Sequence, residues 1–297
     1  MSFAAQVGSL EAAKLIFQEY VTLRYQNSER LQGTIEERHG LTGTTLNVPV
    51  SDQIEMQQDN FAPTDIEVTP VEETNVTIQT KNWQLKTVIG GGEKTLFAYD
   101  KIVDHVNLHS KAIGRNLDFI KLDAIFSSPQ FGNIEQVLVN VGANTGINQG
   151  KMSEGLSYLE SQGLDINMEM YDISMWAPAL LKKSMQNDDR IVNFFYNDVK
   201  PLTNNRIQAY LDVDCRFVGE NGVNAIPKTD IGGGIFQYLV PMVFKESIIQ
   251  TFNRDPKTTI TFEENQDRYE LVSVLTSNSG IIQSNGIVLL QANNPFS

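Results

Sequence analysis

The feature that most constrains the fold is a long amphipathic helical pattern over residues 93–127. Apolar side chains recur at three- and four-residue spacing and form one face: Tyr99, Ile102, Val103, Val106, Ile113, Leu117, Ile120 and Ala124. About 30 residues at a rise of ~1.5 Å each give a rod of roughly 45 Å, longer than a small domain is wide. We therefore predict a spine helix along which other elements pack, with Lys101, Lys111 and Lys121 largely outside the apolar face.

The part of the chain before this helix has no apolar interior of its own. Residues 3–25 carry a helical apolar stripe, whereas residues 27–80 are rich in Thr, Gln, Asp and Glu. Two alternating stretches, Thr45 to Val48 and Asn75 to Thr80, predict strands with one buried face. A two-stranded ribbon is not stable alone in water. We therefore expect these leading segments to become ordered through neighbouring subunits, as is typical of an assembly protein.

The remainder of the chain indicates an α+β fold. We predict a helix over residues 151–162, a strand over 168–171, and a helix capped by Ser174 that runs through Met185. Further strands are expected over residues 212–218, 237–243, 258–262, 268–276 and 286–291.

Composition and charge exclude several classes of function. The 297 residues carry a net charge of -13, and a chain that grips nucleic acid needs clustered Lys and Arg instead. Such a chain can still line a compartment that holds DNA. The single cysteine, Cys215, cannot form an intramolecular disulfide, and we interpret it as a small buried strand residue. No run of about 18 apolar residues predicts a membrane helix, and the N-terminus lacks a basic signal-peptide start. We therefore expect the chain in a cytoplasm or in a particle assembled there.

Glycine-rich segments resemble cofactor loops only superficially. Gly90 to Thr95 fails as a phosphate loop because Glu93, rather than glycine, precedes the lysine. We interpret Gly90 to Gly92 as a hinge between the ribbon and the spine helix. Gly232 to Gly234 has no strand-then-helix frame around it and is expected to be a loop.

Titratable side chains also give no catalytic or metal centre. His105 and His109 are four residues apart, as two metal ligands can be, but no third ligand is evident. We expect a surface or interface pair, and His39 is the one other histidine. Asp212 and Asp214 share a strand face, where we expect solvation rather than acid–base work. We assign no catalytic, cofactor-binding or metal-binding residue and predict that the chain is not an enzyme.

An ordered series of stretches carries a family resemblance. Tyr25 to Leu31 is followed by Ala112 to Asp118, by Phe195 to Leu202 ahead of the strand Val213 to Val218, and by Asp267 to Tyr269. This series resembles the major capsid proteins of tailed bacteriophages with the Hong Kong 97-type fold, and more closely the podovirus-like phage capsid family.

The resemblance implies an organisation for the whole chain. Residues 1–44 would be an N-terminal arm and residues 45–90 an extended β-ribbon loop, or E-loop. Residues 91–140 and 251–297 would form a peripheral domain with the spine helix, and residues 141–250 an axial domain.

The resemblance also implies a function. The chain would be a major capsid protein that self-assembles into hexamers and pentamers and forms the icosahedral head around the phage dsDNA genome. Implied partners are a portal and a separate scaffolding protein, because no charged coiled-coil segment precedes the arm; a decoration protein is left open. The expected location is the virion, assembled in the bacterial host cytoplasm, with no cofactor, no sequence-specific DNA binding and no membrane.

Two other functions remain open at this point. One is the shell of an encapsulin-type nanocompartment, which shares this fold, and the other is a β-rich virion accessory such as a decoration or tail protein. The long spine helix argues against the accessory. Covalent crosslinking through Lys81, Lys86 or Asn60 is not expected, because nothing identifies a partner residue.

Overall fold

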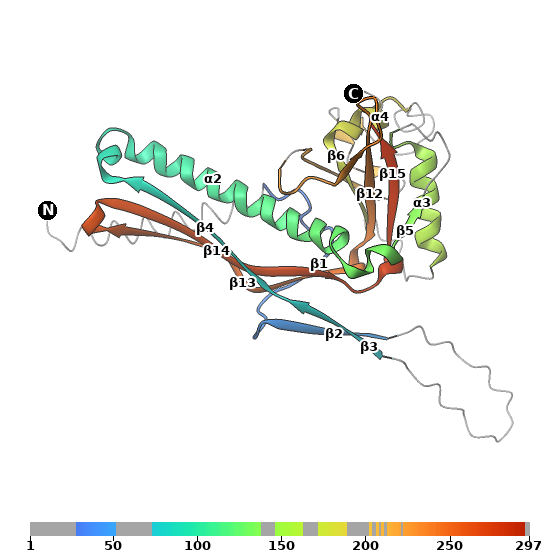
Figure 1. Cartoon of the computed structure of the whole chain (residues 1–297), viewed down its shortest axis with the longest axis horizontal. Helices are drawn as coiled ribbons and strands as arrows, with labels where there is room; N and C mark the ends of the chain where they lie inside the picture. Colours follow the sequence, from blue (N-terminus) through green and yellow to red (C-terminus); the bar gives the residue numbers. More distant parts are fainter. Residues whose placement is uncertain are drawn as a thin grey trace, which may run out of the picture.

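The computed structural model describes residues 28–51, 73–137, 146–162, 172–188, 202–203, 206–207, 209–210, 213–220 and 222–294. The spine helix is present as α2 (Gly91–Phe126), which is 36 residues long and confirms the predicted helix. It runs along an elongated lobe and ends beside a compact lobe (Figure 1). Among the described residues, no helix is long and apolar enough to span a membrane.

The elongated lobe is a sheet covered by α2. Its strand order is β1-β13-β14-β4, in which β13 and β14 are antiparallel, as are β14 and β4, and β1 is parallel to β13. The strands are β1 (Glu36–Arg38), β4 (Lys81–Gly90), β13 (Ile248–Glu263) and β14 (Arg268–Ile281). Val106, Ile113, Leu117 and Ile120 of α2 pack on sheet residues that include Leu271, so these members of the predicted apolar face are confirmed as buried.

The compact lobe is a second, seven-stranded sheet. Its strand order is β5-β15-β12-β6-β10-β9, and β11 also pairs with β12. The strands are β5 (Glu135–Val137), β6 (Ile173–Pro178), β9 (Ala209–Tyr210), β10 (Val213–Val218), β11 (Lys228–Asp230), β12 (Phe236–Phe244) and β15 (Ile287–Asn293). Helix α3 (Gln149–Ser161) packs on β15, where a Cβ on Gly155 would lie 2.8 Å from Leu290 Cδ2. The predicted helix over 151–162 and the strands of this lobe over 212–218, 237–243 and 286–291 are confirmed.

The prediction of a helix capped by Ser174 is wrong. Ser174 lies in β6, a strand buried along its whole length between β12 and β10, and its Oγ accepts a hydrogen bond from Trp176 Nε1 at 2.9 Å. The helix, α4 (Lys182–Gln186), begins only after a 3-10 turn. Burial of the apolar β6 residues between two strands overrides the local capping signal. The strand expected over residues 168–171 lies outside the described residues.

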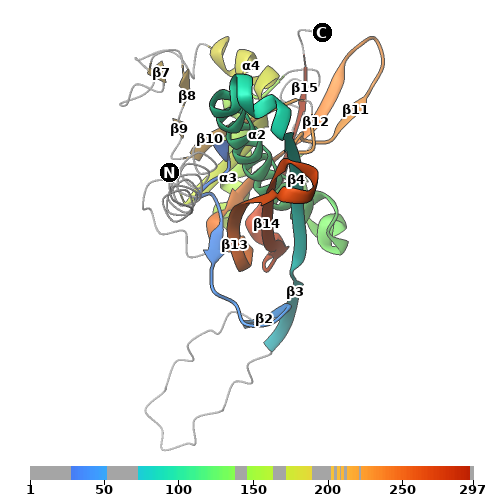
Figure 2. The same ribbon diagram turned by 90° about the vertical axis from the view of Figure 1, so that its left-hand side faces the viewer.

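A two-stranded ribbon projects from the elongated lobe. It consists of β2 (Thr45–Ser51) and β3 (Glu73–Gln79), paired antiparallel with Thr45 opposite Gln79, and both predicted strands are confirmed. Figures 1 and 2 show the ribbon pointing away from both lobes. The remaining described strands, β7 (Leu202–Thr203) and β8 (Arg206–Ile207), pair with each other.

Candidate assembly surfaces

The segment Ser28 to Arg38, which we call the arm segment, is embedded in the chain's own body. Leu31 and Ile35 are buried in the core that α2 shares with the compact lobe. The Asp118 carboxylate on α2 accepts hydrogen bonds from the backbone N–H of Arg30 at 3.1 Å and of Leu31 at 3.0 Å. A carboxylate that binds main-chain donors fixes the path of a segment more firmly than apolar contact alone.

Lys121 of α2 is the centre of this anchorage. Its Nζ donates to Glu29 Oε1 at 2.7 Å, to Glu37 Oε1 at 2.9 Å and to the Leu31 carbonyl oxygen at 2.9 Å. The side chain is fully buried, which its position outside the predicted apolar face did not indicate. The helical pattern could not show that the arm segment covers this edge of α2. Burial raises the pKa of Glu29, and the neighbouring Lys121 acts in the opposite direction.

Gly114 of α2 permits the close approach of the arm segment to the helix. A Cβ on Gly114 would lie 2.3 Å from Ser28 Oγ and 2.9 Å from the Glu29 nitrogen. The arm segment therefore lies directly on the helix backbone. Our expectation that the leading segments become ordered only through neighbouring subunits is wrong for residues 28–38, since these are held by their own chain. Residues 1–27 lie outside the described part.

The ribbon has a small apolar base and an open outer face. Val48, Ile78 and Ile249 form a separate buried cluster that joins β2 and β3 to β13. The alternate ribbon residues, among them Asn47 and Asn75, are exposed. A single face of the ribbon thus packs on the body at its base, and the other face is free to meet another molecule.

The hinge was expected in the wrong place. Gly90 is the last residue of β4 and pairs with Arg268, and Gly91 begins α2, so Gly90 to Gly92 joins sheet to helix. The ribbon instead joins the body at Thr80, whose backbone N–H and hydroxyl both donate to the Thr44 carbonyl oxygen, at 2.9 and 3.0 Å. The prediction failed because the sequence did not separate β3 from β4.

We expect the angle of the ribbon to depend on Gly280. An added Cβ at this position would lie 2.7 Å from Ile78 Cγ1 and 2.9 Å from Ile78 Cδ1. Gly280→Ala should therefore displace the ribbon base and lower the free energy of unfolding by about 1–3 kcal/mol, the usual cost of overpacking. Gly132→Ala is the control, because nothing lies within 4 Å of its added Cβ. Equal urea midpoints for the two variants would contradict the expectation.

The two spine histidines form part of a buried polar chain rather than the expected surface or interface pair. His109 is fully buried; its Nε2 lies 2.8 Å from Thr87 Oγ1 and its Nδ1 lies 2.7 Å from Ser273 Oγ. His105 is half-buried, and its Nδ1 lies 3.1 Å from the same Thr87 oxygen. Burial, aided by the nearby His105, lowers the pKa of His109 to about 4. Helical spacing could not show that β4 and β14 present hydroxyl groups to this face.

The other candidate residues that the structure describes contact other parts of the same chain. Cys215 is buried in β10, as predicted, and burial next to Asp214 raises the pKa of its thiol to about 12. Asp214 pairs with Arg216 at 2.7 Å, whereas Asp212 lies outside the described residues. His39 stacks on Phe252. No group of three His, Cys, Asp or Glu side chains in the described part of the chain can hold a metal ion.

Gly232 to Gly234 and the two lysines considered for crosslinking, both in β4, are the remaining candidate residues. The three glycines all have positive φ and form a loop between β11 and β12, as predicted. Lys81 pairs with Asp123 at 3.7 Å and Lys86 with Glu270 at 2.6 Å, within the same chain. Asn60 lies outside the described residues, so the expectation of no crosslinking stays a prediction.

Solved structures with this fold include capsids. The capsid of cyanophage P-SCSP1u matches with a TM-score of 0.63 and 11% identity, covering 86% of each chain. A protein of Gordonia phage Cozz matches with a TM-score of 0.62 and 11% identity over 89% of this chain and 86% of the other. A virus-like particle from Pyrococcus furiosus matches with a TM-score of 0.59 and 8% identity over 94% and 99%. The chain therefore has the expected α+β, Hong Kong 97-type capsid fold.

The comparison by sequence distinguishes between the functions that proteins with this fold have. No curated protein matches the chain by sequence. The family model described as phage capsid protein matches residues 11–291, which is nearly the whole chain. This match disfavours the nanocompartment shell, which the fold alone does not exclude. It also argues against a β-rich accessory protein and against an enzyme, because the matched family is a structural one. The chain belongs to the phage capsid protein family and is a major capsid protein, a structural subunit of the virion shell.

Proposed function

We propose that copies of this chain form hexamers and pentamers that close into an icosahedral head around the phage dsDNA genome. The observation that carries this proposal is the β2–β3 ribbon, which projects from the body (Figure 1) and whose alternate residues are exposed. Such a ribbon gains little from its own chain beyond the small apolar cluster at its base. A neighbouring copy supplies the missing contact area, and many weak contacts per subunit make closure cooperative.

We propose that the two lobes are the domains that the family resemblance implies. We assign the elongated lobe to the peripheral domain and the compact lobe to the axial domain, which would meet its copies around the local symmetry axis. Strand pairing supports two adjustments to the expected ranges. β4 pairs with β14 and so goes with the peripheral sheet, and β15 pairs with β12 and so goes with the axial sheet.

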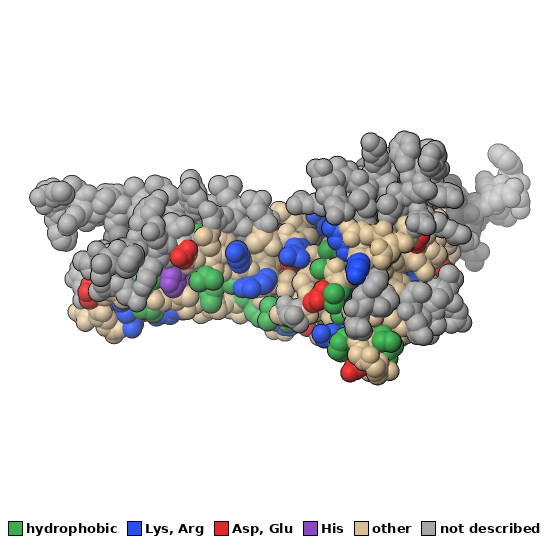
Figure 3. Space-filling model, turned by 90° about the horizontal axis from the view of Figure 1, so that it is seen from above, with side chains coloured by type: hydrophobic (Ala, Val, Ile, Leu, Met, Phe, Trp, Pro, Cys, Tyr) green, Lys and Arg blue, Asp and Glu red, His purple; other side chains and the backbone are tan. Residues whose placement is uncertain are grey.

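Charge supports enclosure of DNA without sequence-specific binding. The net charge is -13, and the face in Figure 3 shows Lys and Arg side chains interspersed with hydrophobic, Asp and Glu side chains. A surface of mixed sign does not grip phosphates strongly. The proposed partners are a separate scaffolding protein and a portal, with assembly in the bacterial host cytoplasm; a decoration protein is left open.

Shell formation with and without the ribbon tests this function. The chain is expressed with its scaffolding gene and examined by sedimentation and negative-stain microscopy, where closed particles are expected. The matched variant replaces residues 46–78 with two glycines, because Thr45 and Gln79 are already paired and need only a turn between them. This variant should stay as small soluble assemblies. A wild-type chain that remains monomeric, or a shortened chain that closes shells normally, would contradict the proposal.

A further inference from the structure

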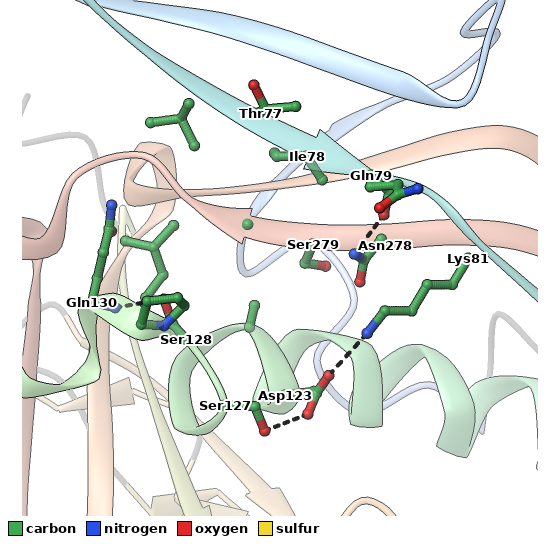
Figure 4. A pocket seen from close by; sticks show the side chains of 15 residues that line it. Thr77, Ile78, Gln79, Lys81, Asp123, Ser127, Ser128, Gln130, Asn278 and Ser279 are labelled. Carbon is green, nitrogen blue, oxygen red and sulfur yellow. Dashed lines mark hydrogen bonds and ion pairs between the residues drawn. The ribbon is translucent and has the colours of Figure 1, made fainter.

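A groove of about 390 Å³ lies where the ribbon base, the end of α2 and β14 meet (Figure 4). Its walls come from five separate elements, β3, β4, α2, β14 and the 3-10 turn η1 (Pro129–Asn133). They include Gln79 of β3, Asp123 of α2, Ser279 of β14 and Gln130 of η1. No residue assigned above to the arm anchorage lines it.

Two buried polar atoms in this groove have no hydrogen-bond partner among the described protein atoms. They are Ser279 Oγ, on a side chain that is only 7% exposed, and Gln130 Oε1. A buried polar atom without a partner costs about 1–3 kcal/mol, so native proteins rarely retain one. The amide oxygen can only accept a hydrogen bond, and the hydroxyl can accept or donate. The pair therefore points to an occupant that carries N–H donors.

The groove also contains a free strand edge. The ladder between β14 and β4 ends at Ser277 opposite Lys81, whereas the ladder between β14 and β13 continues to Ile281. Along residues 278–281, β14 thus has no ladder partner on the groove side in the described part of the chain. The Asn278 side chain donates from Nδ2 to the Gln79 carbonyl oxygen at 2.7 Å, where β3 crosses. An unpaired edge is a template for an added strand.

The charges of the groove indicate a neutral occupant. Lys81 and Asp123 are the charged residues that line it, and they pair with each other at 3.7 Å (Figure 4). Their charges offset each other, so the groove offers no net attraction to phosphate, carboxylate or a metal ion. Neutral main chain fits this arrangement better than any charged ligand.

We propose that an extended main-chain segment of a second copy of this chain occupies the groove. The segment would add to the free edge of β14 and donate hydrogen bonds to Ser279 Oγ and Gln130 Oε1. This inference rests on the proposed shell, in which each copy is surrounded by identical copies at high effective concentration. It specifies one contact site between copies in that shell, at the groove where the ribbon joins the body.

Cryo-electron microscopy of assembled wild-type shells tests the proposal directly. We expect main-chain density in the groove that can be traced to a neighbouring copy. An empty groove, ordered water alone, or a segment of a different protein would overturn the inference while leaving the shell intact. Absence of shells would overturn the proposed function itself, and this inference with it.

A variant pair gives a second test. Ser279→Leu places an apolar side chain in the groove, and Thr259→Leu is the control at an exposed position of β13. We expect Ser279→Leu to lower the assembled fraction about tenfold at fixed subunit concentration, with thermal unfolding like that of the control. Normal assembly would overturn the proposal.

If Ser279→Leu does not fold, the rate of amide hydrogen exchange in wild-type residues 278–281 tests the proposal instead. Slower exchange in shells than in free subunits supports an occupied groove, and equal exchange refutes it.

Discussion

Lys121→Met is expected to lower the free energy of unfolding of the unassembled subunit by about 3–5 kcal/mol, the cost of removing one partner from a buried ion pair. Methionine fills a similar volume, so the change removes the charge and its donors and leaves the packing in place. The Glu29 carboxylate then stays buried without the ammonium group that lies 2.7 Å from it in the native chain, whereas the Leu31 carbonyl oxygen keeps its hydrogen bond from Thr34 Oγ1. Urea unfolding followed by intrinsic fluorescence measures the loss.

Lys111→Met is the matched control for this prediction, because Lys111 is exposed on the same helix. Its effect should stay within about 0.5 kcal/mol, as for most surface substitutions. Adding Glu29→Gln to Lys121→Met should recover part of the lost stability, since no buried carboxylate is then left unpaired. Similar losses for the two lysine variants would show that the arm segment is not held by Lys121.

The second large effect is a loss of stability in acid that depends on His109. Its pKa is about 4 in the folded chain and about 6.5 in an unfolded one. The unfolded chain therefore binds a proton at a higher pH than the folded chain does. The neutral imidazole contributes its stability fully above pH 6.5, and this is lost as the pH falls toward 4, by ~3 kcal/mol in all. Protonation would charge a ring that is fully buried between α2 and the sheet.

Comparison with His109→Gln isolates this effect. Glutamine can keep a hydrogen bond to Thr87 or Ser273 but does not titrate. The stability advantage of the wild type over the variant should be constant above pH 6.5 and should shrink between pH 6.5 and 4. Burial raises the pKa values of Glu29 and Asp118, but these groups are present in both proteins and cancel in the difference. Parallel stability curves over this range would refute the assignment.

Periodic patterns in the sequence predicted the elements whose burial is regular. The apolar face of α2 and the alternation in β2 and β3 follow directly from side-chain geometry, so both could be recognised without a structure. The same patterns failed at Lys121, His109 and Ser174. In each case the residues that bury the side chain are distant in the sequence. They are the arm segment for Lys121, the hydroxyl-bearing residues of β4 and β14 for His109, and the flanking strands for Ser174.

Two of the stretches that carry the resemblance to capsid proteins contact each other in the fold. Arg30 and Leu31 end the first of these stretches, and Asp118 ends the second. In the structure the Asp118 carboxylate accepts hydrogen bonds from the backbone of both residues. The two motifs thus form one joint between the arm segment and the spine helix. Neither motif alone indicates that joint, because their separation in sequence carries no information about contact.

We expect copies of this chain themselves to form the wall of the head. A single-particle reconstruction of purified particles, computed without imposed symmetry, would show which chain forms that wall. We expect a wall made of this chain in sixfold and fivefold rings, with each β2–β3 ribbon lying on an adjacent copy. A wall built from a different chain, with this protein attached to its surface or absent from it, would refute the assignment of this chain as the shell subunit.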